Sequence, residues 1–156
     1  MRRKDREIKD EAELGDILEK GTACHLSLVD GAEPYGISLN YGFERRGSAW
    51  IFYFHCAEEG RKLDIIKRNN RASVSVDVDH RLIPGAEACG WGMAYRSVIG
   101  SGRIDIVDGS AERQRGMDAI MRHYAGLPSF DYDEKFFEAT LILKMAIDVL
   151  RGKKKE

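Results

Sequence analysis

The sequence has few cysteines, no long apolar run and almost no net charge, and each of these absences excludes a class of protein. Its three cysteines, Cys24, Cys56 and Cys89, are odd in number and not closely paired, which excludes a disulfide framework. The segment MRRKDREIKDEAEL has no apolar stretch behind its basic residues, so we expect a cytoplasmic, reduced protein. No apolar run approaches the roughly 18 residues of a membrane-spanning helix.

The nearly equal numbers of basic and acidic residues argue against binding to polyanions. Lys and Arg total 25 against 26 Asp and Glu, which gives a formal net charge of −1. Because a basic surface supplies most non-specific binding to polyanions, we expect neither nucleic acid nor an anionic membrane as a partner. A length of 156 residues suits a single domain over 1–156, which would bury about 70% of its unfolded surface.

Several common sequence motifs are missing. Gly100 and Gly102 begin a glycine pattern, but Arg103 and a strand follow, so a dinucleotide-binding fingerprint is excluded. The chain also lacks a P-loop, a nucleophile elbow and a CxxC pair. No metal site is predicted, because the four histidines lack metal-ligand spacing among themselves. These histidines are His25, His55, His80 and His123.

The alternation of apolar and polar residues predicts a mainly β fold. Strands are expected over 22–29, 34–43, 49–55, 72–78, 93–107 and 139–150, and helices over about 10–21, 59–69 and 110–124. The aromatic and β-branched run 49–55 is typical of a strand buried on both faces. Gly100 and Gly102 predict a bulge, and 80–92 reads as a long loop. Six strands in meander order with peripheral helices favour a small antiparallel barrel.

The stretch FYFHCAEEGRKLDIIK places a basic helix start directly after an apolar strand. The first helical turn leaves backbone N–H groups without partners and carries a partial positive charge. Gly60 allows an anion to approach the backbone, and Arg61 and Lys62 add charge, so the pattern indicates a phosphate site. The alternative is that both cations belong to the solvated face of an amphipathic helix.

His55 ends the buried strand a few residues before this helix start. Its imidazole either faces the same cavity as the phosphate site or is a satisfied core histidine. The adjacent Cys56 points to the opposite face of the strand, so the two side chains do not form a nucleophilic pair.

The segment YGISLNYGFE carries Asn40 and Gly42 inside an otherwise regular strand. A flat ligand lying on the backbone would explain both, because Gly permits close approach and Asn offers donors and acceptors to a polar ring edge. A bulge at a barrel corner would explain them equally well.

Four segments taken together resemble the pyridoxamine 5′-phosphate oxidase-like flavoproteins, and most closely their 5-nitroimidazole resistance branch. They are MRRKDR, PYGISLNYGFE, YFHCAEEGRKLDIIKRN and ACGWGMAYRSVIGSGRI, in the order that the family has them. The resemblance implies a six-stranded antiparallel FMN-binding split barrel with peripheral helices. It also implies a homodimer with two FMN sites at the subunit interface.

The resemblance assigns roles to individual residues. In one subunit the flavin ring would lie along Ser38, Leu39, Asn40 and Tyr41 with His55 nearby, and Arg61 and Lys62 would hold the phosphate. In the other subunit Trp91, Tyr95, Arg96 and Ser97 would approach the same flavin. His55 and Arg96 are the expected catalytic residues. The chain departs from the family at Ser38, where a proline is expected, and at Asn69-Asn70, where Asn-Pro is usual.

The function implied by this resemblance is that of an FMN-dependent oxidoreductase acting on a small, planar, electron-poor substrate such as a nitroaromatic. The C-terminus shows no pyridoxal-phosphate-binding pattern, so oxidation of pyridoxamine phosphate itself is not expected. One alternative is a non-catalytic flavin- or haem-binding module with the same barrel. Another is a barrel without a cofactor that acts as a dimeric interaction protein.

Overall fold

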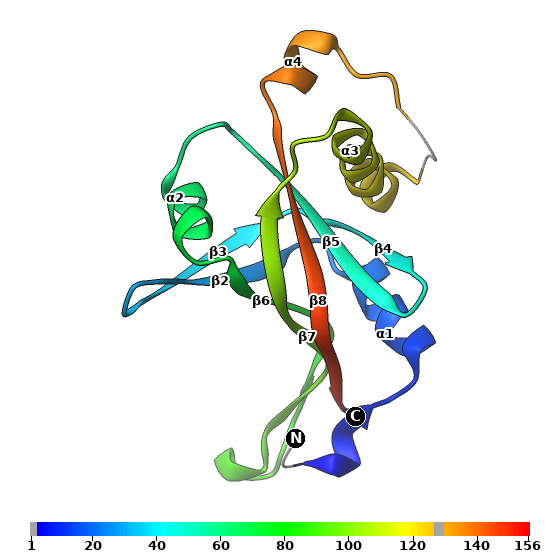
Figure 1. Ribbon diagram of the computed structural model, residues 1–156. Coiled ribbons are helices and arrows are strands. Elements are labelled where there is room, and N and C mark those ends of the chain that lie inside the picture. Colours follow the sequence, from blue (N-terminus) through cyan, green and yellow to red (C-terminus); the bar gives the residue numbers. More distant parts are fainter. Residues whose placement is uncertain (1–2, 127–129) are drawn as a thin grey trace.

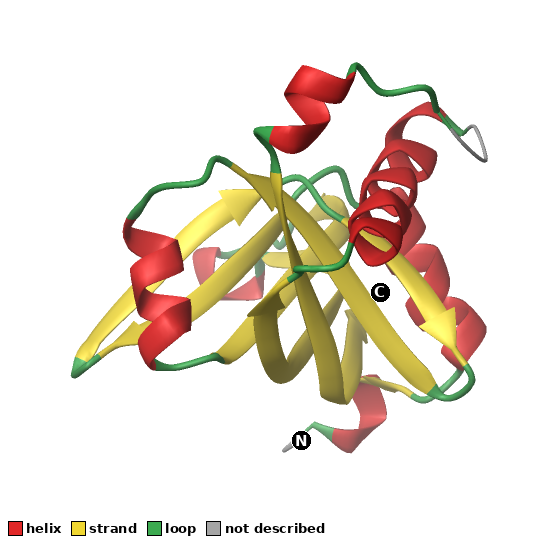
Figure 2. Ribbon diagram, turned by 45° about the horizontal axis from the view of Figure 1, so that its top comes forward, coloured by secondary structure: helices red, strands yellow, loops and turns green. Residues whose placement is uncertain are grey.

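Antiparallel strands are the commonest element of the computed structural model, which describes residues 3–126 and 130–156 (Figure 1). Within these residues the eight strands are β1 Glu7–Ile8, β2 Cys24–Asp30, β3 Glu33–Leu39, β4 Gly42–Arg46, β5 Ala49–Cys56, β6 Arg71–Ile83, β7 Gly92–Ile106 and β8 Leu141–Lys155. They form one curved sheet in the order β3-β2-β6-β7-β8-β5-β4, and β1 pairs with β8 (Figure 2). The predicted mainly β class is confirmed, with eight strands in place of six.

Helices lie at the periphery of this sheet, as predicted, and the buried faces of α1 and α2 join the core inside it. They are α1 Glu11–Lys20, α2 Arg61–Arg68, α3 Ser110–Ala125 and α4 Glu134–Glu138, and two short 3-10 helices span Lys4–Arg6 and Ala88–Gly90. The Asp10 side chain caps α1 by accepting a hydrogen bond of 3.0 Å from the Ala12 backbone N–H. The first two residues of the segment MRRKDR lie outside the described residues.

The meander order and the single strand over 34–43 are both wrong. β3 ends at Leu39 and pairs with β2, whereas β4 begins at Gly42 and pairs with β5, so these two strands lie at opposite ends of the sheet. The chain crosses between them beneath α3, and a Cβ on Gly42 would come within 2.3 Å of the Ile120 backbone nitrogen. This close passage explains the glycine and moves Asn40 and Tyr41 out of the ladder.

The loop predicted over 80–92 is shorter than expected, because residues 80–83 and 92 belong to strands and only 84–91 lie outside them. β6 continues past a bulge between Val78 and Arg81, and its last residues pair with the start of β7, for example Leu82 with Met93. The result is a long hairpin arm that projects from the lower part of the molecule (Figure 1). Asp79, at the bulge, has a φ of 57°, which is uncommon for a residue with a side chain.

The bulge predicted near the two glycines of β7 is confirmed. The register between β7 and β8 shifts between Ser101 and Gly102. A Cβ on Gly102 would lie 1.9 Å from the carbonyl oxygen of Ala146, so no other residue fits here without moving the backbone. The bulge increases the local bend of the sheet.

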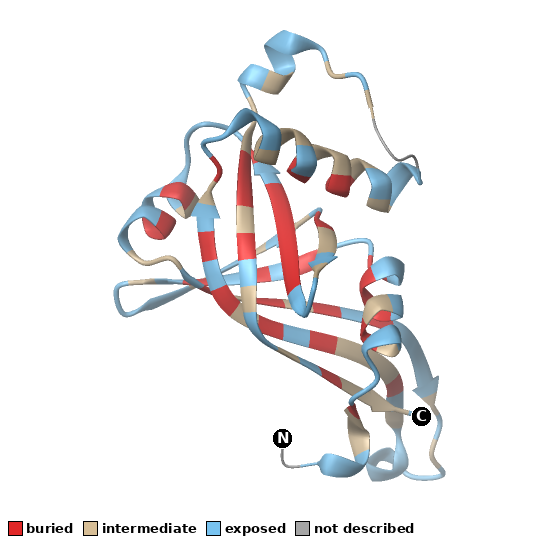
Figure 3. Cartoon of the chain, turned by 45° about the vertical axis from the view of Figure 1, so that its right-hand side comes forward, coloured by how far each residue is buried: buried red, intermediate tan, exposed pale blue. Residues whose placement is uncertain are grey.

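The core has two parts, and their arrangement explains the pattern of β5. Inside the curved sheet, alternate residues of the strands are buried, such as Leu26 of β2 and Val76 of β6 (Figure 3). On the other face of β5, α3 buries a second cluster that includes Tyr53 and Ile120. Because both faces are covered, residues 50–54 are all buried, which confirms the prediction from their composition.

Candidate functional site

The start of α2 has the geometry that an anion site needs. Gly60 precedes the helix with a φ of 140°, a conformation that side-chain-bearing residues rarely adopt, and nothing lies within 4 Å of the Cβ it lacks. The Gly60 carbonyl accepts hydrogen bonds from the backbone N–H groups of Leu63 at 2.9 Å and Asp64 at 3.4 Å. The N–H groups of Arg61 and Lys62 are not used by this carbonyl, and they lie with the positive end of the helix dipole next to the open space beside Gly60.

The two cations at this helix start differ in what surrounds them. Arg61 donates from Nε to the Asp30 carboxylate at 3.1 Å, and its guanidinium lies 5.2 Å from the ring centre of Tyr35. Lys62 is half-buried and forms no salt bridge with any residue that the structure describes. Lys62 is therefore the cation at this helix start that a phosphate could bind without displacing a carboxylate.

The end of β5 lies close to this helix start. Only residues 57–60 separate β5 from α2. Burial raises the pKa of the Cys56 thiol, and the positive charge of Lys62 opposes this change. His55, one residue earlier, is exposed, whereas Cys56 is buried. The opposite orientation of the two side chains is confirmed, and the interpretation of His55 as a core histidine is wrong.

The predicted ring-contact segment, Ser38 to Tyr41, runs from the last residues of β3 toward β4. The Ser38 side chain is exposed and lies across the strand pair from His25 of β2. Leu39 is half-buried. Asn40 is exposed, and its amide donates to the Thr22 carbonyl at 3.4 Å.

Tyr41 differs from the other residues of this segment because its side chain belongs to the core. It is fully buried, and its hydroxyl donates to the Leu18 carbonyl at 2.6 Å. Burial raises the pKa of the Tyr41 phenol, so the hydroxyl keeps its proton. Only the backbone of Tyr41 is left to contact a ligand.

The residues expected to approach the flavin from the other subunit do not share one face of β7. Alternation along the strand puts Tyr95 and Ser97 on the outer face and Arg96 on the opposite side. The Arg96 guanidinium binds two carboxylates there, Asp16 at 2.8 Å and Asp79 at 2.6 Å. To reach a ligand on the outer face, Arg96 would have to leave both.

A hollow on the outer face of β7 and β8 was not identified from the sequence. Its volume is about 460 Å³, and three neighbouring cross-strand pairs line it: Ser97 with Lys153, Ile99 with Arg151, and Ser101 with Val149. Ile99 is 56% exposed and Val149 is 44% exposed, which is unusual for apolar strand residues away from a sheet edge. The hollow offers apolar contact beside two cations, Arg151 and Lys153, that have no salt-bridge partner among the described residues.

The exposed Trp91 stands near the start of β7, on the hairpin arm. Its side chain is 50% exposed. Lys153 of β8 lies with its amino group 5.7 Å from the ring centre of Tyr95, so the outer face near the arm combines aromatic rings with positive charge. No motif search would find this arrangement, because it depends on the register of β7 against β8.

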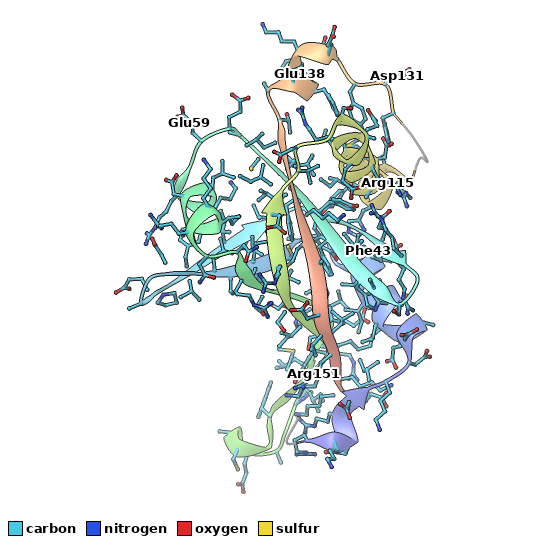
Figure 4. The ribbon with its side chains drawn as sticks, viewed as in Figure 1. Phe43, Glu59, Arg115, Asp131, Glu138 and Arg151 are labelled. Carbon is cyan, nitrogen blue, oxygen red and sulfur yellow. The ribbon has the colours of Figure 1, made fainter. Side chains whose placement is uncertain are left out.

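The helix start and the hollow are separate places on one chain. Figure 4 shows Glu59, just before α2, far from Arg151, which lines the hollow on β8. On the sheet, β2 and β6 stand between β3 and β7. One chain therefore places Arg61 beside Asp30 of β2 and Tyr35 of β3, and it places Ser97 at the hollow on β7 and β8.

Neither a metal centre nor a membrane helix is found in the part of the chain that the structure describes. No group of three or more His, Cys, Asp or Glu side chains in residues 3–126 and 130–156 is arranged to hold a metal ion. None of the described helices has both the length and the apolar character needed to cross a bilayer.

Comparison with known proteins agrees with the fold and identifies the family. A model of the family described as pyridoxamine 5′-phosphate oxidase matches residues 10–154. A candidate 5-nitroimidazole antibiotic resistance protein from Bacteroides thetaiotaomicron is similar in structure, with a TM-score of 0.81 and 25% identity, covering 96% of this chain and 90% of that one. A search of curated protein sequences found no match.

Two further solved structures share the fold at lower identity. The FAD- and haem-binding protein from Mycobacterium smegmatis has a TM-score of 0.80 and 23% identity, covering 97% of this chain and 74% of that one. The flavocytochrome Anf3 from Azotobacter vinelandii has a TM-score of 0.80 and 18% identity, covering 100% of this chain and 72% of that one. At these identities the likeness shows the fold alone.

Proposed function

Because the chain belongs to the pyridoxamine 5′-phosphate oxidase family, we propose that it is an FMN-dependent oxidoreductase that reduces a small, planar, electron-poor acceptor of the nitroimidazole type. The observation that carries the proposal is the anion geometry at the start of α2. Gly60 leaves the helix end open, and Lys62 stands beside it without a carboxylate partner among the described residues. A ligand with a phosphate group fits this position.

Different residues near this helix start would bind different parts of the cofactor. Lys62 and the first N–H groups of α2 would bind the phosphate, and Arg61 would contribute after releasing Asp30. The exposed backbone from Ser38 to Asn40 would offer hydrogen bonds to the ring edge, together with the main chain of Tyr41. A bound FMN would supply the electron-transfer chemistry, and the protein would supply binding, orientation and electrostatics.

The remaining family residues would come from a second copy of the chain. Tyr95, Ser97 and Trp91 lie away from the helix start, so a site built from both sets needs two chains. A homodimer would also cover Ile99 and Val149, whose exposure is better explained by an isologous interface than by solvent. We therefore propose a homodimer with FMN at the interface.

The acceptor would bind above the flavin ring, between His55 of one chain and the aromatic residues of the other. His55 is exposed at the end of β5 and so is free to contact a bound acceptor. Arg96 would stabilise negative charge that develops on the acceptor, provided that it exchanges its contacts with Asp16 and Asp79.

A second candidate function is a flavin- or haem-binding module that does not turn over. It is favoured by the names of two structures that share the fold, an FAD- and haem-binding protein and a flavocytochrome. A third candidate, a cofactor-free interaction protein, has no specific observation in its favour.

The absorption spectrum of the purified protein separates these functions, because flavin and haem have different visible bands. If flavin is bound, it is photoreduced and its reoxidation by nitroimidazoles and quinones is followed by stopped-flow absorption. We expect faster reoxidation than for free reduced FMN. Equal rates across a panel of acceptors would support the binding module and overturn the catalytic proposal.

A further inference from the structure

The last turn of α3 packs against the segment that connects β3 to β4. This segment has no ladder partner, because β3 and β4 lie at opposite ends of the sheet. Its polar groups are instead bonded to residues distant in sequence, among them Tyr124 of α3, and the adjacent His123 packs its ring against the ring of Tyr41. Neither was singled out as part of the site by its pattern in the sequence.

The Tyr124 hydroxyl connects the segment to the residues that follow α1. It accepts a hydrogen bond of 3.1 Å from the backbone N–H of Tyr41 and donates one of 2.9 Å to the Thr22 carbonyl. The Asn40 amide donates to the same carbonyl at 3.4 Å. The Tyr124 hydroxyl therefore links the Tyr41 main chain to the Thr22 carbonyl, which also accepts the hydrogen bond from Asn40.

The imidazole of His123 packs against the side chain of Tyr41 in the same segment. Its side chain is only 3% exposed, and its ring lies 4.7 Å from the ring of Tyr41. Nε2 lies 2.7 Å from the Gly21 carbonyl, and since a carbonyl only accepts, Nε2 carries the proton.

Among the described residues, this imidazole has one hydrogen-bond partner, the Gly21 carbonyl. Nδ1 has no hydrogen-bond partner among the described residues, because the Glu19 carboxylate stands 3.8 Å away, beyond hydrogen-bond range. The Tyr41 hydroxyl also lies 3.2 Å from the Gly21 carbonyl, so His123 and Tyr41 converge on one backbone oxygen.

We propose that Tyr124 and His123 are positioning residues that hold Asn40 and Tyr41 in the conformation that binds the flavin ring. This inference rests on the proposed function, because it concerns the segment expected to lie along the isoalloxazine. Preorganised donors and acceptors bind more tightly, since the entropy of ordering them is not lost on binding. Neither side chain needs to touch the flavin itself.

The test compares Tyr124, which belongs to α3, with Tyr132, which packs against it. Tyr124→Phe removes the hydroxyl that orders the segment. Tyr132→Phe is the matched control, because the Tyr132 hydroxyl bonds to Asp118 at 3.1 Å and does not contact the segment. Three quantities are measured: the Kd for FMN and for riboflavin, the visible spectrum of the bound flavin, and the hydrogen exchange of the Tyr41 amide in the flavin-free protein.

For Tyr124→Phe we expect a Kd raised roughly fivefold to tenfold, as the loss of one hydrogen bond predicts. The increase should be the same for FMN and riboflavin, because the segment contacts the ring and not the phosphate. The flavin spectrum should shift and the Tyr41 amide should exchange faster, whereas Tyr132→Phe changes none of these. Faster exchange with unchanged Kd and spectrum would overturn the inference, and so would unchanged exchange.

A second pair of variants tests His123 independently. Gln keeps a donor near the position of Nε2, and Leu does not, so His123→Gln should retain flavin affinity and His123→Leu should lose it. Equal binding by both would overturn the role of His123. If the wild-type chain bound neither flavin, the proposed function itself would fail; failure of this inference alone leaves wild-type binding intact.

Discussion

Arg61 and Asp30 form an ion pair across the gap between α2 and the end of β2, with Arg61 Nε 3.1 Å from the carboxylate oxygen. Arg68, two turns along the same helix, binds the other oxygen of Asp30 at 2.5 Å. Asp30 thus holds one face of α2 against the β2–β3 hairpin. A phosphate at the helix start has to compete with this carboxylate for Arg61 but not for Lys62.

The first prediction follows from this difference. Lys62→Ala should weaken FMN binding about tenfold to a hundredfold, since a hydrogen bond to a charged group is worth about 1.5 to 3 kcal/mol. Riboflavin binding should stay nearly unchanged because riboflavin lacks the phosphate. Arg61→Ala should cost less than Lys62→Ala. Fluorescence titrations measure both ligands, and Lys67→Ala, exposed near the other end of α2, is the control. Equal losses for FMN and riboflavin would remove the phosphate assignment.

The second prediction concerns the assembly. Sedimentation should give twice the chain mass of 17.6 kDa. Ile99→Asp puts a carboxylate into the exposed apolar part of the β7–β8 face, so it should shift the protein to monomer and lower its flavin content. Phe136→Asp is the control, because Phe136 is 74% exposed on α4, away from that face. A wild-type monomer with full flavin occupancy would contradict the shared site.

The third prediction separates two roles for Arg96. If it stabilises charge on the acceptor, Arg96→Ala should slow reoxidation of the bound flavin roughly 100-fold without releasing the flavin. Asp79→Ala breaks the same contact with Asp79 but keeps the guanidinium, so it should leave that rate almost unchanged. Stopped-flow absorption measures both variants. Equal slowing in the two variants would show that Arg96 acts only through its structural ion pairs with Asp16 and Asp79.

The fourth prediction concerns stability in acid. Glu112 of α3 accepts hydrogen bonds from Tyr53 at 2.8 Å, Arg46 at 2.8 Å and Lys144 at 2.9 Å. Burial opposes ionisation of this carboxyl, but the three donors outweigh it and lower the pKa of Glu112 from 4.5 to about 2. A folded-state pKa below the unfolded one stabilises the protein above about pH 4.5 and loses that contribution as the pH falls toward 2.

Chemical denaturation between pH 2 and 6 tests this expectation. Glu112→Gln removes the titrating group, so its free energy of unfolding should fall less steeply across that window than the wild type does. Glu134→Gln, on the exposed start of α4, should follow the wild-type curve. Parallel curves for Glu112→Gln and the wild type would show that another carboxyl controls acid stability.

Local features of this protein were predictable from its sequence. The alternation of apolar residues identified most strands, Asp10 marked the start of α1, and the glycines of β7 marked a bulge. The helix start at Gly60 was also recognised. Each of these depends on residues within a few positions of one another, because periodicity and capping are local properties of the backbone.

The tertiary structure alone decided which distant residues meet. It sent β3 and β4 to opposite ends of the sheet, paired Arg61 with Asp30 and turned Arg96 away from Ser97. It also formed the hollow between β7 and β8 and placed Tyr124 on the main chain of Tyr41, 83 residues away in sequence. These contacts depend on strand pairing and register, which are set by the burial of the whole sheet and its helices and not by any single segment.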